Sequence, residues 1–282
     1  MSKTISIVIN GDTRPGYLDP VSKCGAGRGC RSVDFMTTSI ENKIKFFDGY
    51  DVEVTLYIDV HEPIDDQLMA RIQGMFNERR IHNLCLNHNT RLFHGQPIRQ
   101  WHDIMYLNAL MLARGEYVAH FDADAGAFRR PDCDIVERFI NWVDTDYDYV
   151  SYPSKWSPRE NESDEFDYQW ASTRFFFCRR ETLNYNEILR CFGDRDGYIK
   201  KMYGDKPHRV NQMENTLGLI AGPGKIIYPP VEHEQYMIFT WHTYYTGTVA
   251  YLDQMPYELV YDHVMNACGG ICPPCDTHGI QV

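Results

Sequence analysis

Short apolar runs alternate with amphipathic helical patterns along the first half of the chain. Residues 5–9, 52–58 and 81–86 are rich in aliphatic and β-branched side chains and predict strands. Between and after these runs, apolar residues recur at helical spacing, at residues 33–47, 66–76 and 101–114. Alternation of strands and helices is typical of a mostly parallel sheet covered by helices on both faces. The pattern therefore predicts an α/β fold.

A fourth apolar run ends in two carboxylates. Residues 116–124, Glu-Tyr-Val-Ala-His-Phe-Asp-Ala-Asp, lie between Gly115 and Gly126 and predict a buried strand. Side chains two positions apart on a strand share a face, so Asp122 and Asp124 are expected to project together. Adjacent carboxylates repel each other, and a divalent cation such as Mg²⁺ or Mn²⁺ relieves that repulsion. The alternative is a polar strand end whose acids cap the next turn or face water.

The first two predicted strands also end in acids. Asp12 follows the first strand, and Asp59 follows the second. In open α/β sheets, ligands bind at the carboxyl ends of the strands. The convergence of Asp12, Asp59 and the pair Asp122 and Asp124 therefore favours a ligand site over a strand end that faces water.

The second half of the chain predicts further elements of the same kind. Apolar spacing and apolar runs predict two helices and three strands, at residues 135–143, 210–221, 147–152, 172–178 and 226–228. The three consecutive Phe residues within 172–178 indicate a strand buried on both faces. Polar stretches predict loops at residues 11–31, 158–167 and 193–209.

Composition and charge narrow the class of protein. The 282 residues are 43% hydrophobic and 24% charged, which is typical of a globular protein and excludes a disordered chain. The net charge of −11 disfavours an extended nucleic-acid-binding surface. The sequence has no apolar run long enough for a membrane span, and the first ten residues do not resemble a signal peptide. We therefore expect a cytoplasmic location, where the nine cysteines stay reduced.

Residues 107–124 combine a helix ending in Arg-Gly-Glu with an apolar strand and an Asp-X-Asp motif. This stretch resembles the nucleotide-sugar-dependent glycosyltransferases of the GT-A fold, and family 2 in particular. Weaker matches to the family are found in the first two predicted strands, in residues 175–183 and in Met213-Glu-Asn. The resemblance implies a Rossmann-like, mostly parallel central sheet flanked by helices on both faces.

The resemblance also implies a division of the chain. Residues 1–250 are expected to form a single GT-A-like domain. Its first half, residues 1–125, would bind the nucleotide sugar, and residues 126–250 would bind the acceptor. Residues 251–282 would form a C-terminal tail.

The activity implied by the resemblance is metal-dependent transfer of a sugar from a nucleotide-sugar donor to an acceptor hydroxyl. Asp122 and Asp124 match the motif that holds manganese or magnesium against the donor diphosphate, where the metal neutralises charge on the leaving group. Asp12 and Asp59 match positions that contact the base and ribose. Arg14 is a candidate phosphate partner.

Glu214 matches the general base of inverting family members, which accepts the proton of the attacking hydroxyl. Its alternative role is to favour a helix N-terminus. Some members have a further metal ligand after the last core strand, for which His233 is the first candidate and His242 the second; an ordinary loop histidine is the alternative for both. The acceptor stays open among a glycan, a small molecule, a protein and a modified nucleotide.

Three other functions compete with this interpretation. A phosphohydrolase would need a hydroxylated residue after the second Asp, but Ala125-Gly126 follows here. A nucleotidyltransferase would need a Gly-rich basic loop directly after the first strand. The only candidate for such a loop, residues 25–29, lies later in the chain. A non-catalytic GT-A-like binding module is disfavoured because both carboxylates and a candidate base are present.

The Gly- and Arg-rich segment up to Arg31 and the acidic residues 156–170 depart from the family pattern, which leaves the sugar and the acceptor open.

The C-terminal tail contains zinc-ligand residue types. These are Cys268, Cys272, Cys275 and His278, with Cys24 and Cys30 as candidates from the N-terminal loop. Their spacing matches no standard zinc finger. A structural zinc site and a frayed tail with free thiols therefore both stay open.

Overall fold

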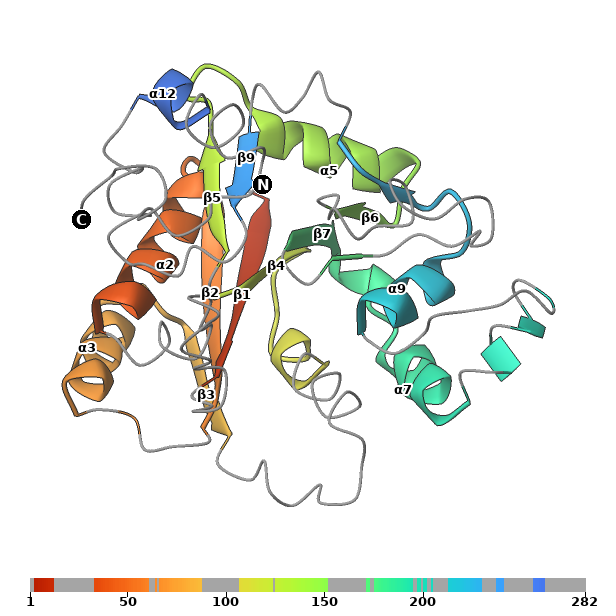
Figure 1. The fold of residues 1–282 in the computed structure, drawn as a ribbon, viewed down its shortest axis with the longest axis horizontal. Helices are drawn as coiled ribbons and strands as arrows, with labels where there is room; N and C mark the ends of the chain where they lie inside the picture. Colours follow the sequence, from red (N-terminus) through yellow and green to blue (C-terminus); the bar gives the residue numbers. More distant parts are fainter. Residues whose placement is uncertain are drawn as a thin grey trace, which may run out of the picture.

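The centre of the protein is a seven-stranded sheet in the order β3-β2-β1-β4-β7-β6-β8 (Figure 1). The computed structural model describes residues 3–12, 33–60, 64, 66–87, 107–123, 125–151, 171–172, 175–194, 197–198, 200–201, 204, 213–229, 237–240 and 256–261. The strands are β1 (Thr4–Asp12), β2 (Asp51–Asp59), β3 (Asn83–Asn87), β4 (Tyr117–Asp122), β6 (Tyr149–Ser151), β7 (Phe175–Arg179) and β8 (Ile226–Ile227). β7 is antiparallel to β4 and β6, and the other neighbouring pairs are parallel. The predicted mostly parallel α/β sheet is confirmed.

Helices cover both faces of this sheet, as the sequence predicts (Figure 1). One face packs against α2 (Val33–Phe46), α3 (Asp66–Asn77) and α5 (Ile135–Thr145). The other face packs against the helical residues 107–110, α7 (Tyr185–Gly193) and α9 (Met213–Ala221). A second, two-stranded sheet pairs β5 (Gly126–Arg129) with β9 (Met237–Thr240), and α12 (Tyr257–Tyr261) lies near the end of the described chain.

Strand β7 shows how the two hydrophobic cores are built. Phe175 and Phe177 pack into the core under α2 and α5, whereas Phe176 packs into the core under α7 and α9. This alternation follows from the two-residue period of a strand. The prediction that this strand is buried on both faces is confirmed.

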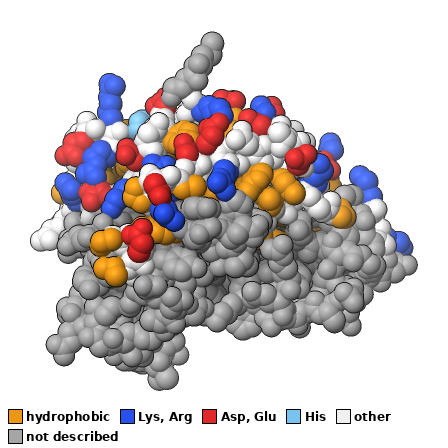
Figure 2. Space-filling model, turned by 90° about the horizontal axis from the view of Figure 1, so that it is seen from above, with side chains coloured by type: hydrophobic (Ala, Val, Ile, Leu, Met, Phe, Trp, Pro, Cys, Tyr) orange, Lys and Arg blue, Asp and Glu red, His pale blue; other side chains and the backbone are white. Residues whose placement is uncertain are grey.

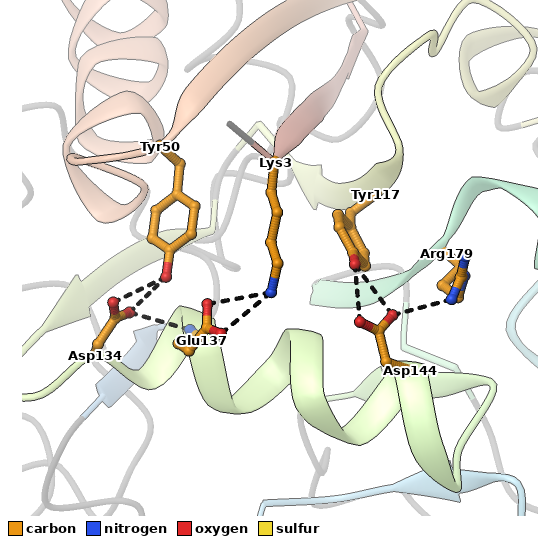
Figure 3. A network of polar contacts seen from close by, with 7 residues as sticks. All are labelled: Lys3, Tyr50, Tyr117, Asp134, Glu137, Asp144 and Arg179. Atoms are coloured by element: carbon orange, nitrogen blue, oxygen red, sulfur yellow. Dashed lines mark hydrogen bonds and ion pairs between the residues drawn. The ribbon is translucent and has the colours of Figure 1, made fainter. Parts of the chain in front are cut away.

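Helix α5 is fastened to the amino edge of the sheet by polar contacts (Figure 3). Lys3, just before β1, binds Glu137 at 3.1 Å, and the hydroxyl of Tyr50, just before β2, donates to Asp134 at 2.9 Å. The Tyr117 hydroxyl, at the start of β4, donates to Asp144 at 3.0 Å. Burial, together with the bond to a carboxylate, raises the pKa of both tyrosines, so they stay protonated donors at neutral pH. These contacts hold α5 at the edge opposite the strand ends that carry the acids.

Some predicted details are wrong. The sequence pattern places Phe76 on the buried face of α3, but Phe76 is 40% exposed and Met75 is buried instead. The sequence predicts a helix that runs to Arg114 and is stopped by Gly115. This segment is helical at residues 107–110 and turns at 111–112, so Gly115 is not its C-terminal stop. Helix α7 and the pair β5–β9 were not predicted.

Other predictions fall on residues that the structure does not describe. They are the loops at residues 13–31 and 158–167, residues 195–196, 199, 202–203 and 205–209 of the loop predicted at 193–209, the first half of the predicted helix at 101–114, and the cysteine-containing tail. No helix in the described parts of the chain is long and apolar enough to cross a membrane.

Charged side chains are mixed on the face seen from above in Figure 2. Acidic and basic groups alternate over the described part of this face, and no broad patch of either sign forms there.

Candidate functional site

The carboxyl ends of four parallel strands bring polar residues from distant segments to one edge of the sheet. Asp12, the last residue of β1, is in register with Asp59 of β2, which is in register with Asn87 of β3. On the other side of β1, Asn10 is in register with Asp122 of β4. Because neighbouring strands lie about 4.8 Å apart, the four strand ends span roughly 15 Å. The predicted convergence of Asp12, Asp59 and Asp122 is therefore present in the strand pairing.

The Asp-X-Asp motif begins at the end of β4 and continues into a turn. β4 ends at Asp122, which is half-buried, and Ala123 lies in the turn. The Ala123 N–H donates to the carbonyl of Asn10 at 2.8 Å, and the Ala125 N–H donates to the carbonyl of Asp122 at 3.1 Å. The predicted strand extends to Asp124, whereas β4 ends two residues earlier. Asp124 itself lies outside the described residues.

Three polar side chains of α2 bind the backbone of this turn. The Ser39 hydroxyl donates to the carbonyl of Ala123 at 2.5 Å, and the Lys43 ammonium group donates to the carbonyl of Ala125. The Asn42 amide donates to the carbonyl of Ala127 at 2.9 Å and accepts from the Ala127 N–H at 2.8 Å.

These contacts fix the turn from one side. Ser39, Asn42 and Lys43 are buried, and the three alanines that they bind are at most 4% exposed. A small side chain at each alanine allows the turn to pack directly against α2. We call residues 122–127 the acidic turn, and its described backbone groups are held in place before any ligand binds.

The segment that leads into β4 is fixed by a second polar cluster, which lies on the face of β1 opposite to α2. The Ser6 hydroxyl donates to Glu53 at 2.6 Å and accepts from the Gly115 N–H at 2.7 Å. Asn83 and the Arg114 N–H also donate to Glu53, at 2.8 and 3.0 Å. Burial alone would raise the pKa of Glu53, but these hydrogen bonds outweigh it and lower the pKa, so the carboxylate is charged at neutral pH.

Asn10 has a buried side-chain amide at the carboxyl edge. It is 4% exposed, and neither its carboxamide oxygen nor its nitrogen has a hydrogen-bond partner in the structure. Buried polar groups nearly always have a partner, so an unsatisfied amide beside Asp122 points to a polar ligand or water that completes the site. Together with the half-buried Asp122, this oxygen-rich donor set fits Mg²⁺ or Mn²⁺ and a polar ligand.

The remaining predicted site residues are placed only in part. Asp12 and Asp59 are located by their backbone, and Glu214 is the second residue of α9. Arg14, His233 and His242 lie outside the described residues, as do Cys24, Cys30, Cys268, Cys272, Cys275 and His278. Within the described ranges, no group of three or more His, Cys, Asp or Glu side chains could hold a metal ion. A metal site that uses Asp122 therefore needs ligands from other parts of the chain or from a bound molecule.

The sequence-based prediction missed Asn10, Ser39, Asn42 and Lys43. Ser39, Asn42 and Lys43 have the spacing i, i+3 and i+4, which places them on one side of a helix. Polar residues in such a row are usually a solvated face, so the spacing alone did not indicate buried contacts. Asn10 directly follows the apolar run of β1, and that position was the available signal.

Comparisons with known proteins give fold likeness at low sequence identity. No family model matches the chain, and no curated protein matches its sequence. Among solved structures, the galactosyltransferase LgtC, in complex with donor and acceptor sugar analogues, aligns with a TM-score of 0.46 and 13% identity over 79% of this chain and 72% of LgtC. The mannosyltransferase PcManGT from Pyrobaculum calidifontis, in complex with GDP-Man and Mn²⁺, aligns with a TM-score of 0.41 and 16% identity over 82% of this chain and 55% of that chain.

Proposed function

We propose that the protein is a metal-dependent GT-A glycosyltransferase that moves a sugar from a nucleotide-sugar donor to an acceptor hydroxyl. The observation that carries this proposal is the row of strand ends at the carboxyl edge, where the register brings Asp12, Asp59 and Asp122 together. The fixed acidic turn next to this row and the unsatisfied amide of Asn10 support it. Preorganised polar groups of this kind contribute strongly to transition-state stabilisation.

Each proposed role follows from position and residue type. Asp122 and Asp124 hold the divalent cation, which neutralises charge that develops on the diphosphate leaving group. Asp12 and Asp59 bind the nucleoside, and Arg14 binds a phosphate. His233, with His242 as the second choice, supplies a further metal ligand. Residues 1–125 form the donor-binding half and residues 126–250 the acceptor-binding half.

We further propose an inverting reaction with Glu214 as the base. Glu214 belongs to the first turn of α9, which ends at Ala221 before the chain turns into β8. β8 runs parallel to β6, so it begins at the amino edge of the sheet, and α9 leads the chain back to that edge. The first residues of α9 are thus at the end of the helix far from the amino edge. A carboxylate there accepts the proton of the attacking hydroxyl.

A thermal-shift measurement with Mn²⁺ and a panel of nucleotide sugars tests the donor site. A ligand that binds only the folded state at about 100 times its Kd stabilises the protein by about 2.7 kcal/mol. We expect a rise in Tm that needs both Mn²⁺ and the matching nucleotide sugar, and that is lost in Asp122→Asn and in Asp124→Asn.

The matched control is Asp51→Asn. Asp51 is an exposed acid at the amino edge of the same sheet, so its replacement should leave the ligand-dependent rise in Tm unchanged. Equal stabilisation of Asp122→Asn and the unmodified protein would contradict the metal site. Stabilisation by nucleoside triphosphates and not by nucleotide sugars would instead favour a nucleotidyltransferase.

A further inference from the structure

Asn10 and Asn42 are two buried asparagines that contact the acidic turn, and their side chains are paired very differently. Asn42 is 1% exposed, and its amide binds the backbone of Ala127 through both polar atoms, at 2.9 and 2.8 Å. Asn10 is 4% exposed, and it contacts the turn through its backbone carbonyl, which accepts from the Ala123 N–H at 2.8 Å. Neither polar atom of the Asn10 side chain has a hydrogen-bond partner in the described parts of the chain. The backbone of Asn10 supports the turn, and its amide has another use.

The side chain of Asn10 lies on the same face of the sheet as that of Asp122. Val8, two residues before Asn10, packs into the core under α7 and α9. On β4, His120 stacks on Phe176 of the same core at 5.0 Å, so Asp122, two residues later, projects from that face as well. Asn10 and Asp122 are in register on neighbouring strands, so their backbones are about 5 Å apart. A ligand group held by Asp122 is therefore within reach of the Asn10 amide.

A buried amide without partners is unfavourable for folding. Burial removes water from both polar atoms, and each atom that gains no hydrogen bond in exchange destabilises the folded protein. A leucine at position 10 has nearly the same shape as the asparagine and would avoid this cost. The asparagine is thus explained by what it binds and not by what it stabilises.

We propose that Asn10 is a substrate-binding residue whose amide binds a vicinal pair of hydroxyl groups on the nucleotide-sugar donor. This inference rests on the proposed function, in which Asp122 holds the cation at the diphosphate. A carboxamide has an acceptor and a donor side by side, and a vicinal diol presents the matching donor and acceptor. Diphosphate oxygens only accept, so they would leave the carboxamide oxygen of Asn10 without a partner.

Two parts of the donor carry such a diol next to the diphosphate. The ribose and the transferred sugar are joined directly to the diphosphate, and both have vicinal hydroxyl groups. The nucleobase lies beyond the ribose, so it is farther from a cation held by Asp122. A hydroxyl group beside Asp122 can also donate to its carboxylate, which a diphosphate oxygen cannot do.

The binding test compares the unmodified full chain with Asn10→Leu, using three probes in the presence of Mn²⁺. The probes are the nucleotide sugar of the thermal-shift panel that stabilises the protein most, its nucleoside diphosphate, and the dideoxy form of that nucleoside diphosphate, which lacks both ribose hydroxyl groups. Calorimetry gives the Kd of each probe. If Asn10 binds the ribose, Asn10→Leu raises the Kd of the first two probes by about tenfold and leaves that of the dideoxy probe unchanged. If Asn10 binds the transferred sugar, only the Kd of the nucleotide sugar rises.

A second variant covers the case in which Asn10→Leu does not fold. Asn10→Ala also removes both polar atoms of the side chain and should give the same pattern of Kd values. The pattern across the three probes, and not the size of one change, carries the inference, because a general disturbance of the site would weaken all three alike.

The matched control is Asn42→Leu, which removes a buried amide that is paired at both polar atoms. Chemical unfolding should give opposite signs for the two variants. Asn10→Leu should lower the equilibrium constant of unfolding by about tenfold, and Asn42→Leu should raise it by about tenfold or more. In Asn42→Leu, the Kd values of the three probes should change by one common factor, because Asn42 acts through the turn.

Three results would overturn the proposal. Unchanged Kd values for all three probes in Asn10→Leu would assign the amide to a buried water only. A rise by the same factor for all three, the dideoxy probe included, would place Asn10 against the base or the diphosphate. A loss of stability in Asn10→Leu as large as in Asn42→Leu would show that the amide serves the fold. If no nucleotide sugar stabilises the unmodified protein, the proposed function fails and this inference fails with it.

Discussion

Gly115 lies directly against the backbone of β1. A Cβ atom at this position would be 2.7 Å from the Ser6 nitrogen and 2.8 Å from the Thr4 carbonyl oxygen. Both are main-chain atoms of a central strand and cannot move aside easily. The glycine in Arg-Gly-Glu therefore permits the close approach of the segment before β4 to β1, which is a different reason from the helix stop that the sequence predicts.

Gly115→Ala is expected to destabilise the protein. Overpacking against a rigid backbone costs about 1–3 kcal/mol, and the shift would also disturb the bond from the Gly115 N–H to Ser6. Gly74→Ala is the control, because a Cβ there meets nothing within 4 Å and Gly74 lies inside α3. Replacement of a helix-interior glycine by alanine stabilises by about 0.5–1 kcal/mol. Urea unfolding of both variants should give opposite signs, and equal signs would contradict the close-approach argument.

Helix α5 shows which elements can be read from the sequence. All five residues predicted to form its buried face are buried, because its 3.6-residue pattern is unbroken over three turns. The pair β5–β9 escaped prediction because it joins two four-residue segments that are more than a hundred positions apart. Such short strands are defined by their partner rather than by their own pattern. Helix α7 was missed although its apolar positions also recur at helical spacing, and it is only nine residues long.

The N-cap residue of α5 accepts a second hydrogen bond, from a side chain outside the helix. Asp134 accepts from the Glu137 N–H at 3.0 Å and also from the Tyr50 hydroxyl. Asn184 caps α7 through the Glu187 N–H at 3.2 Å.

Asp134→Ala should therefore destabilise more than Asn184→Ala. Loss of an N-cap costs about 1 kcal/mol, and loss of the Tyr50 bond adds about 1 kcal/mol. We expect about 2 kcal/mol for Asp134→Ala and about 1 kcal/mol for Asn184→Ala from chemical unfolding. Removal of Asp134 should also lower the pKa of Tyr50, which ultraviolet titration detects, since the Asp134 bond and charge both raise that pKa. Equal losses of stability in the two variants would argue against a contribution from Tyr50.

At the scale of the whole molecule, the sequence predicted which strand ends carry acids better than how the neighbouring turn is held. The acids at the ends of β1, β2 and β4 could be predicted because each follows an apolar run, and parallel strands align their carboxyl ends. The contacts of Ser39, Asn42 and Lys43 with the acidic turn connect positions more than eighty residues apart. No local pattern encodes such a pairing, so it emerges only from the packing of α2 against the end of β4.

The proposed division into a donor-binding half and an acceptor-binding half predicts that donor binding and turnover are separable. Glu214 lies in α9, outside the strand ends that are proposed to bind the donor. Glu214→Gln should keep the rise in Tm given by Mn²⁺ with the nucleotide sugar, while turnover, followed as release of the nucleoside diphosphate, falls by about 10²–10⁴-fold.

The control for this variant is Glu258→Gln in the first turn of α12, which also removes an acid near a helix N-terminus. If Glu214 only favours the start of α9, its replacement costs about 0.3–1 kcal/mol of stability, and turnover changes no more than in the control. A fall of a few-fold would count against Glu214 as the base. Loss of the Mn²⁺-dependent rise in Tm in Glu214→Gln would instead contradict the division into two halves, because the donor would then depend on α9.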